Sequence, residues 1–424
     1  MVNYSFVATD MFTTSWALKC VKMKRLKYIL LLSLFTFHFS LASVPVLGFQ
    51  DGVQEYYAQA DSATVSQDGS LLYFHRAEAV AKRALVDVEA LRFGEAESVP
   101  EAVTITWEGD TVYVHNPFAL DSVRVWVENR THVRVRIESE TLETPFVLAG
   151  ESADGSFKLY STHKYRLTLD NLKLIHSTGA PINIQTGKKG TIVLPEGSVS
   201  VLSDGEVYTD TVPGEDQKGC FFSEGQLIFT GEGTLQVSSL SKHAIASDDY
   251  LRVESGKVEV TSAGKDAMHG KDSVIIAGGT TILHASGDGI DTDNAVFLRG
   301  GTLSINVTGP DVKGISADTL LVISGTTTNI VTSGNGDKGI KTKGNMFVQG
   351  GMTTINQTGA VHHYINDEGE ADTAKVIGIK VDGNLTITDG MVTVINMATE
   401  GRSIKCDGTY TKTGGTVRVY PAVE

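Results

Sequence analysis

The chain has 424 residues, and its 50 aspartates and glutamates outnumber its 36 lysines and arginines, which gives a formal net charge of −14 at pH 7. This acidic balance repels nucleic-acid phosphates, so it excludes nucleic acid as a general partner and favours bound cations. The length is sufficient for two structural units and a large core.

The first recognisable element is a targeting segment at residues 23–42, MKRLKYILLLSLFTFHFSLA. It has a basic beginning, an apolar centre too short to span a bilayer comfortably, and small residues at its end, which is typical of a secretory signal peptide. We therefore predict that residues 1–42 are an upstream extension plus a signal peptide, with the true start at Met23. No later run is apolar enough to cross a membrane, so we expect a secreted, periplasmic or cell-surface protein.

The next two segments differ in pattern. Residues 43–102 include RAEAVAKRALVDVEALRF, which is helical in pattern but has no clear stop signal, and we predict a linker or short helix there. Residues 103–175 contain SVRVWVENRTHVRVRIES, in which apolar and polar positions alternate on both sides of an Asn-Arg-Thr turn. This pattern predicts an antiparallel hairpin within a small N-terminal β unit, which precedes or caps the repeats that follow.

From residue 176 onward we predict repeated coils. Apolar or small anchor residues recur at intervals of 22 to 25 residues, with one interval of 39: Cys220, Ile245, Met268, Ile290, Ile315, Ile340, Ile379 and Ile404. A glycine stands eleven residues after nearly every anchor, and short runs rich in Val, Ile, Leu and Thr lie between the two columns. One coil cannot bury its apolar side alone, so it stacks on its neighbours. The sequence therefore predicts an all-β fold, a right-handed parallel β-helix (solenoid) over 176–424, with a loop insertion near 360–375.

Aspartates recur on both sides of the anchors and predict a metal site. The stretch GDGIDTD at residues 287–293 crowds three of them together. Successive coils bring equivalent side chains to about 4.8 Å, where carboxylates repel unless they are protonated or bridged by a cation. Ca²⁺ takes about six to eight oxygen ligands and would relieve several at once. We predict its ligands among eight residues: Asp248, Asp249, Asp266, Asp272, Asp288, Asp291, Asp293 and Asp318. The alternative is a set of solvated turn aspartates.

Lysines occupy a column one position after the later anchors. Lys341, Lys380 and Lys405 share this column, and Lys338 is near it in sequence. A polyanion such as polygalacturonate, lying along the coils, would compensate these charges, so we predict that these four lysines bind polysaccharide. The alternative is a set of solubilising lysines paired with neighbouring acids.

Several linked motifs between Gly155 and Ile305 resemble one family. They are GSFKLYSTHKYRLTLDNLKL, GAPINIQTGKKGTIVL, DQKGCFFSEGQLIFTGEGTLQV, SKHAIASDDYLRVESGKVEVTSAGKDAMHGKDSVIIAGGTTIL and ASGDGIDTDNAVFLRGGTLSI. Together they are similar to a bacterial family of secreted carbohydrate-binding proteins built on a right-handed parallel β-helix, over roughly Val103 to the C-terminus. The resemblance implies calcium in the solenoid turns, a pectate-lyase-like fold, and binding of plant cell-wall polysaccharide such as cellulose and acidic pectic chains.

The favoured function is therefore non-catalytic polysaccharide binding with Ca²⁺, and no catalytic residue is assigned. Two alternatives remain. A calcium-dependent pectate lyase would need a basic residue opposite the metal, for which Lys271, Lys313 and Lys338 are the candidates. A surface adhesin or stalk would use the same solenoid as a spacer, with no sugar ligand.

Overall fold

The computed structural model describes residues 36–38, 43–57, 60–66, 68, 70–77, 79–95, 101–138, 143–366 and 368–421. The predicted all-β fold is confirmed, and the chain divides into two compact units. Unit 1 holds Met1–Gln50 and Tyr56–Val99, and unit 2 holds Asp51–Glu55 and Pro100–Glu424. Among these described residues, no helix has the length and hydropathy needed to cross a membrane. Apart from residues 36–38, the predicted signal peptide lies outside the described residues.

Unit 1 is built from antiparallel strands. A four-stranded sheet holds β1 (Thr36–His38), β4 (Ser62–Val65), β5 (Leu71–Arg76) and β6 (Ala79–Ala84), and β2 (Ser43–Phe49) pairs antiparallel with β7 (Val88–Glu95). In the described residues of 43–102, strands stand where a linker or short helix was predicted, together with a 3-10 turn at Leu85–Asp87. The helix-forming residues of β6 pair along β5, so tertiary pairing overrides local propensity.

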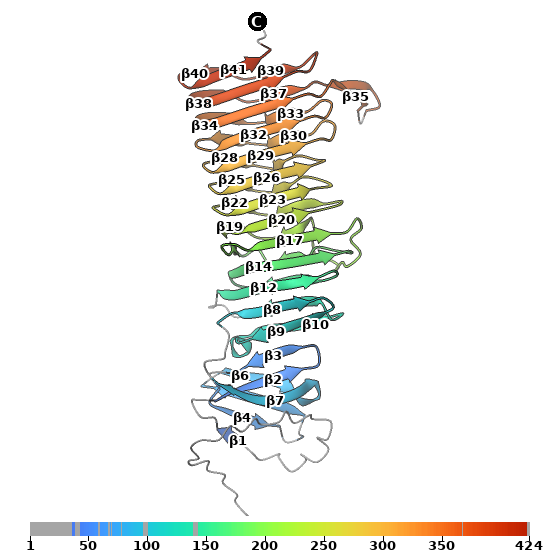
Figure 1. The fold of residues 1–424 in the computed structure, drawn as a ribbon, viewed down its shortest axis with the longest axis vertical. Helices are drawn as coiled ribbons and strands as arrows, with labels where there is room; N and C mark the ends of the chain where they lie inside the picture. Colours follow the sequence, from blue (N-terminus) through green and yellow to red (C-terminus); the bar gives the residue numbers. More distant parts are fainter. Residues whose placement is uncertain are drawn as a thin grey trace, which may run out of the picture. The chain divides into compact units, whose positions relative to one another are not determined.

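Unit 2 is a parallel β-solenoid of about eleven turns (Figure 1). One wall is a 12-stranded sheet, called here the main sheet. Its strands, in spatial order, are β10 (Val123–Glu128), β11 (His132–Ile137), β13 (Ser156–Ser161), β15 (Ile182–Gln185), β18 (Gly219–Ser223), β21 (His243–Ser247), β24 (Met268–Gly270), β27 (Ile290–Thr292), β30 (Lys313–Ala317), β33 (Lys338–Thr342), β37 (Ile377–Val381) and β39 (Arg402–Cys406). Every neighbouring pair is parallel except the hairpin β10–β11.

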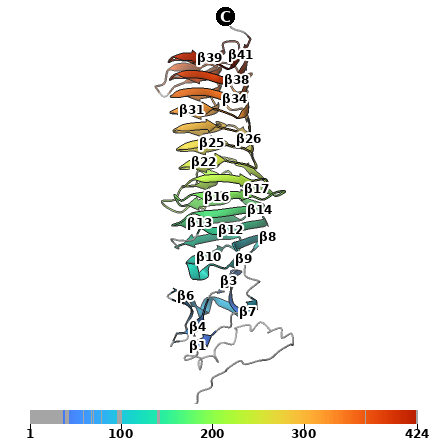
Figure 2. The same cartoon turned by 90° about the vertical axis from the view of Figure 1, so that its left-hand side faces the viewer.

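Two further parallel ladders close the turns, and Figure 2 shows their strands stacked one above another. The first runs through β8 (Val103–Glu108), β12 (Thr144–Ser152), β14 (Tyr165–His176), β16 (Gly190–Leu194), β19 (Leu227–Gly231), β22 (Tyr250–Val253), β25 (Ser273–Ile276), β28 (Ala295–Leu298), β31 (Leu320–Ile323), β34 (Asn345–Gln357), β38 (Leu385–Asn396) and β40 (Tyr410–Lys412). The second adds β17 (Val199–Asp204), β20 (Thr234–Ser238), β23 (Lys257–Ser262), β26 (Thr280–Ala285), β29 (Thr302–Val307), β32 (Thr327–Thr332) and β41 (Thr416–Tyr420). At the start of the unit, β3 (Val53–Tyr56) pairs with β9 (Thr111–Asn116).

The solenoid begins upstream of the predicted boundary at residue 176. β12 pairs in parallel with both β8 and β14, and β11 pairs in parallel with β13, so residues 103–175 are the first turns and not a separate β unit. The predicted hairpin is present as β10–β11, with Val125 opposite Val135. An N-terminal antiparallel β unit is therefore present, as predicted, but most of its strands lie before residue 96 and not within 103–175.

The predicted anchor column is in register on the main sheet. Ile245, Met268, Ile290, Ile315, Ile340, Ile379 and Ile404 are successive partners on neighbouring strands. The first anchor is Phe221 and not Cys220, because Phe221 is the partner of Ile245. Both side chains are fully buried, so hydrophobicity alone does not distinguish the two positions.

A second glycine column, directly before the anchors, sets how closely the walls pack. It holds Gly289, Gly314, Gly339 and Gly378. A Cβ built on Gly339 would lie 2.4 Å from Cγ2 of Ile355 and 2.6 Å from the carbonyl oxygen of Gly378. Only a hydrogen fits there, so this column lets the isoleucines of the facing wall fill the core.

The 39-residue interval contains an exposed hairpin. β35 (His362–Ile365) and β36 (Ala371–Ala374) form a two-stranded antiparallel sheet, which projects beside the C-terminal turns in Figure 1. Asp367 lies outside the described residues. The stack continues from β33 to β37 as though the hairpin were absent.

Candidate functional site

A groove of about 700 Å³ opens at the main sheet, beside β21 and β24. One side is contributed by the segment between β17 and β18. The lining residues are Tyr208, Thr211, Glu215, Asp216, Gln217, Lys218, Ser241, Lys242, His243, Asp248, Lys265, His269, Lys271 and Asp293. The groove is therefore open, strongly polar and built from three successive turns plus one long connection.

Ion pairs engage some of the charged side chains of the groove and leave others free. Lys218 Nζ lies 3.0 Å from Asp216 and 2.6 Å from Asp248, and Glu215 is 3.0 Å from Lys158. The other lysines of the lining, Lys242, Lys265 and Lys271, have no carboxylate partner in the part of the chain that the structure describes. The lining holds four lysines and four carboxylates, so its formal charge is balanced, but these three ammonium groups are available to an anionic ligand.

Two histidines and an aspartate meet at the floor of the groove. Nδ1 of His243 lies 3.1 Å from Oδ2 of Asp266, and its Nε2 lies 3.0 Å from Nζ of Lys265. The rings of His243 and His269 stack with centroids 4.6 Å apart, and Nδ1 of His269 is 3.0 Å from Asp291. Burial lowers the pKa of His243, against the opposing effect of Asp266. The cluster can hydrogen-bond a ligand at the floor of the groove.

The eight predicted calcium ligands do not converge. Asp248 and Asp318 are held by Lys218 and Lys343, and Asp291 by His269. The carboxylates of Asp249, Asp266 and Asp288 accept backbone N–H groups, while Asp272 and Asp293 are exposed. Within the described ranges, the groups of three side chains with metal-binding spacing are His132, Asp154, His176 and His243, Asp266, His269, and both contain two histidines. A calcium cage made from the predicted aspartates alone does not fit this geometry.

One of the predicted calcium ligands, Asp318, is paired with a lysine of the next turn. Ala317 pairs with Thr342, which places Asp318 beside Lys343 on the next turn, and Lys343 Nζ lies 2.7 Å from Oδ2 of Asp318. The ion pair raises the pKa of Lys343. The repulsion expected from stacked carboxylates is thus relieved here by a side chain of the protein.

The predicted lysine column is in register further along the same sheet. Lys341 is the partner of Lys380, which is the partner of Lys405. Burial, together with the charges of Lys380 and Lys313, lowers the pKa of Lys341. Lys380 and Lys405 have only local contacts, at 3.4 and 3.2 Å, with the aspartates two residues after them.

Lys338 does not belong to this column. It pairs with Lys313 and Ile377 on the neighbouring strands, its residue is only 8% exposed, and its ammonium is bonded to Asp311. It starts its strand two residues before the anchor, whereas Lys341 follows the anchor. The prediction that Lys338 contacts polysaccharide is therefore not supported by its position.

Asp288 makes the stability of the protein depend on pH. Burial raises its pKa from 3.8 to about 7, against the opposing effect of Lys313. The folded chain therefore keeps a proton that the unfolded chain releases, and the free energy of unfolding falls as the pH rises from about 4 to about 7. We expect Asp288→Asn, whose amide oxygen can still accept the N–H of Lys313, to remove this decline and to stabilise the protein at pH 8 by about 2–4 kcal/mol.

Urea unfolding at pH 4 and pH 8 measures this effect. Asp272→Asn is the control, because Asp272 is exposed on the neighbouring turn. Parallel pH curves for the wild type and Asp288→Asn would contradict the expectation.

Sequence reasoning missed His243, the connection between β17 and β18, and the His132 group. A signal for the last was present, since His132, Asp154 and His176 are each 22 residues apart, which is one coil. The alternating pattern of residues 103–175 predicts a separate unit, which hides this period. The side of the groove from residues 208–218 has no repeat and could not be placed by period.

Comparisons with known proteins agree with this architecture. A family model described as "Carbohydrate-binding domain-containing protein" matches residues 132–423. A protein of the same description from Acetivibrio thermocellus is 28% identical over 177 residues, which cover 35% of this chain and 62% of that relative. The chain thus spans less than two thirds of that relative's length.

A solved structure is also similar. It is titled as the polysaccharide lyase-like protein from C. thermocellum, gadolinium derivative. It is 24% identical, has a TM-score of 0.51, and the match covers 58% of this chain and 96% of that one. This likeness shows the fold.

Proposed function

Because the chain belongs to the family of carbohydrate-binding domain-containing proteins, we propose that it is a secreted, non-catalytic protein that binds an acidic polysaccharide along the main sheet. The observation that carries this proposal is the arrangement of lysines along the main sheet. Lys242, Lys265 and Lys271 line the groove, and the column that starts at Lys341 continues on later strands of the same sheet.

A linear polyanion suits this arrangement better than a compact ligand. Neighbouring strands are about 4.8 Å apart, so the lysine column presents one ammonium group per turn along the solenoid axis. A polyuronate carries one carboxylate per sugar and can meet several of these groups at once, which adds many weak contacts along one chain. The open groove also leaves both ends of a polymer free to continue.

Acidic chains are favoured over cellulose by the side chains on this face. Flat neutral glucan chains bind to exposed aromatic rings. On the main sheet, Trp126 donates its indole N–H to Glu128. Tyr208, in the groove, donates its hydroxyl to Asp204, and Nζ of Lys242 lies 5.6 Å from its ring centroid. These rings are engaged by the protein, so charge is the stronger basis for recognition here.

Calcium enters the proposal only together with the polysaccharide. Asp272 and Asp293 are exposed, and their carboxylates have no hydrogen bond or ion pair to the described residues. Two carboxylates are too few for a calcium ion, so uronate carboxylates and water would supply the other oxygens. Calcium would then link polymer to protein without being part of the folded core.

Export is proposed from the signal peptide at residues 23–42. An exported protein would meet polysaccharides outside the cell.

Affinity electrophoresis tests the function. We expect wild-type protein to be retarded in gels that contain polygalacturonate, less in gels with methyl-esterified pectin, and not in gels with hydroxyethyl cellulose. Esterification removes the carboxylate charge and keeps the sugar backbone, so it is the matched control. Equal mobility in all gels would overturn the proposal in favour of a stalk without a sugar ligand. A sustained rise in ultraviolet absorbance on incubation with polygalacturonate and calcium would instead establish a lyase.

A further inference from the structure

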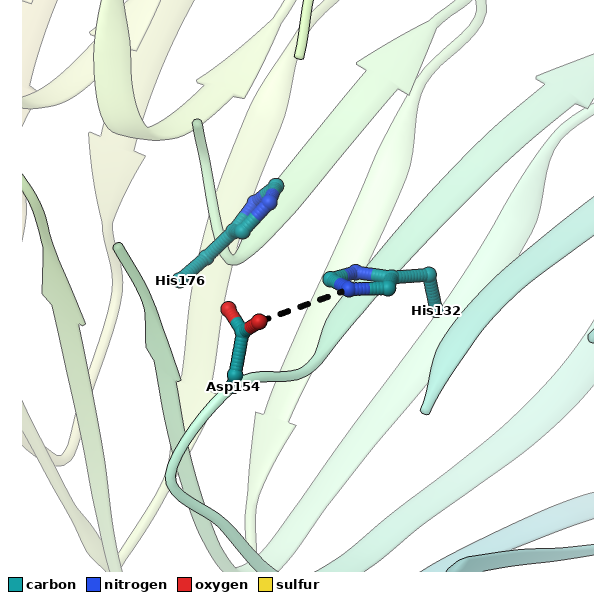
Figure 3. A group of neighbouring side chains, drawn as sticks. All are labelled: His132, Asp154 and His176. Carbon is teal, nitrogen blue, oxygen red and sulfur yellow. Dashed lines mark ion pairs between the residues drawn. The ribbon is translucent and has the colours of Figure 1, made fainter. Parts of the chain in front are cut away.

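Two histidines and an aspartate from three successive turns meet at one corner of the solenoid, outside the lining of the groove. His132 begins β11, Asp154 lies in the turn before β13, and His176 ends β14 (Figure 3). One ligand atom from each lies within 4.8 Å of the others. The two rings are tilted by 50° with centroids 4.9 Å apart, so they converge and do not stack.

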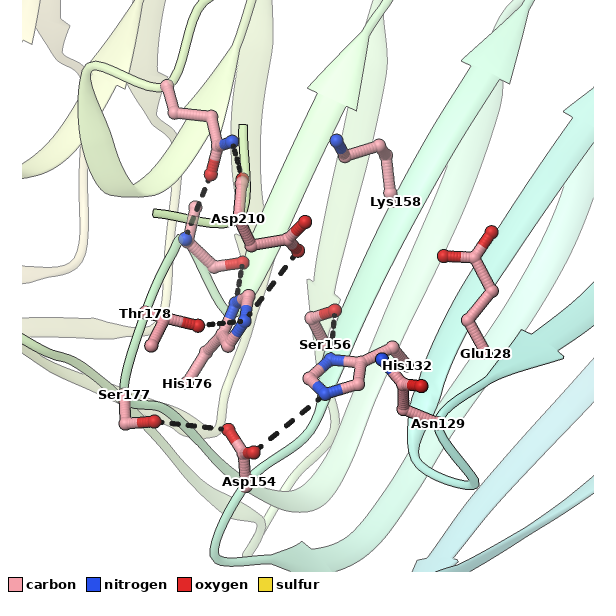
Figure 4. A network of polar contacts seen from close by, with 12 residues as sticks. Glu128, Asn129, His132, Asp154, Ser156, Lys158, His176, Ser177, Thr178 and Asp210 are labelled. Atoms are coloured by element: carbon pink, nitrogen blue, oxygen red, sulfur yellow. Dashed lines mark hydrogen bonds and ion pairs between the residues drawn. The ribbon is translucent and has the colours of Figure 1, made fainter. Parts of the chain in front are cut away.

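The second nitrogen of each ring is already fixed by the protein (Figure 4). Nδ1 of His176 lies 3.1 Å from the carbonyl oxygen of Ala180, which can only accept, so Nδ1 carries the proton and Nε2 has the lone pair, contacted by the hydroxyl of Thr178 at 3.4 Å. Nδ1 of His132 lies 2.9 Å from the hydroxyl of Ser156. Metal-binding histidines are oriented in this way, by a hydrogen bond from the nitrogen that does not bind the ion.

The inward-facing atoms lack good hydrogen bonds to one another. Nε2 of His132 is 3.9 Å from Oδ2 of Asp154, and Nε2 of His176 is 3.7 Å from Oδ2 of Asp210. Both separations exceed a hydrogen bond. Around a tetrahedral zinc ion, neighbouring ligand atoms are about 3.4 Å apart, so small shifts of the two aspartates would close the site. Both aspartates lie outside regular strands, on connections that can make these shifts.

The cluster of His243, Asp266 and His269 in the groove differs from this one in the charge next to its imidazole nitrogens. There, Nζ of Lys265 lies 3.0 Å from Nε2 of His243, so an ammonium group occupies the position next to the imidazole and repels a cation. At His176 the neighbouring groups are Thr178 at 3.4 Å and the Asp210 carboxylate, which attract one. Both clusters have carboxylates beside their imidazoles, but of these two groups among the described residues, the groove cluster is the one with an ammonium group within hydrogen-bond distance of a ring nitrogen.

We propose that His132, Asp154 and His176, with Asp210 as the fourth ligand, form a structural site for a divalent transition metal, zinc in the first place. Two imidazoles and two carboxylates are a ligand set that suits zinc and is unsuited to calcium, which prefers oxygen alone. All four positions come from the protein, so the site is closed and serves stability, not catalysis.

The fourth ligand connects this site to the groove. Asp210 belongs to the segment between β17 and β18, and its backbone carbonyl accepts a hydrogen bond of 2.5 Å from the side chain of Gln217, a residue of the groove lining. The other oxygen of its carboxylate lies 3.7 Å from Arg134. Zinc would therefore fasten this side of the groove to the first turns of the solenoid.

Metal analysis of the untagged chain tests the site. After incubation with Zn²⁺ and dialysis into a buffer with millimolar Ca²⁺, we expect one zinc per chain by mass spectrometry. We expect Asp154→Asn to weaken zinc binding about tenfold and His132→Gln about a hundredfold in calorimetry. Loss of a residue that hydrogen-bonds to a metal ligand costs about 10–100-fold in affinity, and loss of the ligand itself should cost at least as much. Zinc should also slow hydrogen exchange in residues 205–218.

Asp154 has a side chain that is 59% exposed, so Asp154→Asn should fold normally, which circular dichroism can check. Asp170→Asn and His163→Gln are the matched controls, because both residues lie on the same turns and outside the cluster. Wild-type protein that leaves dialysis without zinc overturns the proposal. A double variant, His132→Gln with Asp154→Asn, that holds zinc as tightly as the wild type overturns it as well.

Discussion

Changing Lys341, Lys380 and Lys405 together to serine should lower the affinity for polygalacturonate by about threefold to a hundredfold. Each exposed ion pair contributes about 0.2–1 kcal/mol, and the three ammonium groups are in register on neighbouring strands, so one polymer chain loses all three contacts. Affinity electrophoresis or calorimetry measures the change. The difference between variant and wild type should shrink in high salt, because exposed charges are screened there.

A matched control separates this column from the overall charge. Lys173, Lys188 and Lys412 are exposed and lie outside the main sheet, so their triple change to serine removes the same charge from other surfaces. We expect that variant to bind as the wild type does. Equal weakening by the two triple variants would show that binding is not localised to the column.

Gly339→Ala should lower the free energy of unfolding by about 3 kcal/mol, near the upper end of the range for overpacked cores. The new methyl group would meet Ile355 at 2.4 Å and the carbonyl oxygen of Gly378 at 2.6 Å, and neither is the mobile end of a long side chain. The main sheet and the strand that carries Ile355 must move apart, which disturbs the turns on both sides. Urea unfolding followed by circular dichroism measures the loss.

Gly187→Ala is the companion variant. A Cβ at Gly187 meets nothing within 4 Å, so its unfolding free energy should stay within about 0.5 kcal/mol of the wild type. If both alanine variants were equally stable, the close approach at Gly339 would not limit the packing of the solenoid.

The periodic part of the fold was predictable from sequence because stacking requires repetition. Ile290 and its equivalents recur once per coil, and the structure pairs them as the spacing requires. The glycines eleven residues later, such as Gly301 and Gly351, adopt positive φ angles of 74° and 75°, which explains why that column prefers glycine. The repeat length of the anchors and the glycines at the turns therefore both predict a parallel β-solenoid.

Features without a period were the ones misjudged. Residues 79–95 have the composition of a helix, and only pairing with strands elsewhere in unit 1 makes them extended. Lys338 is near the column of Lys341 in sequence, yet it is almost buried and forms an ion pair with Asp311. The groove depends on a connection that belongs to no repeat, so its side chains could be found only in three dimensions.

The register of the main sheet has a consequence for how such a protein changes over time. A turn contacts only the turns before and after it, so gaining or losing one whole coil leaves the cross-section intact. Each added coil lengthens the molecule by one strand spacing and supplies one more position in the column of Lys341. Under the proposed function, duplication of one coil would therefore lengthen the stretch of polymer that the column contacts by one step. The residues already present would not need to change.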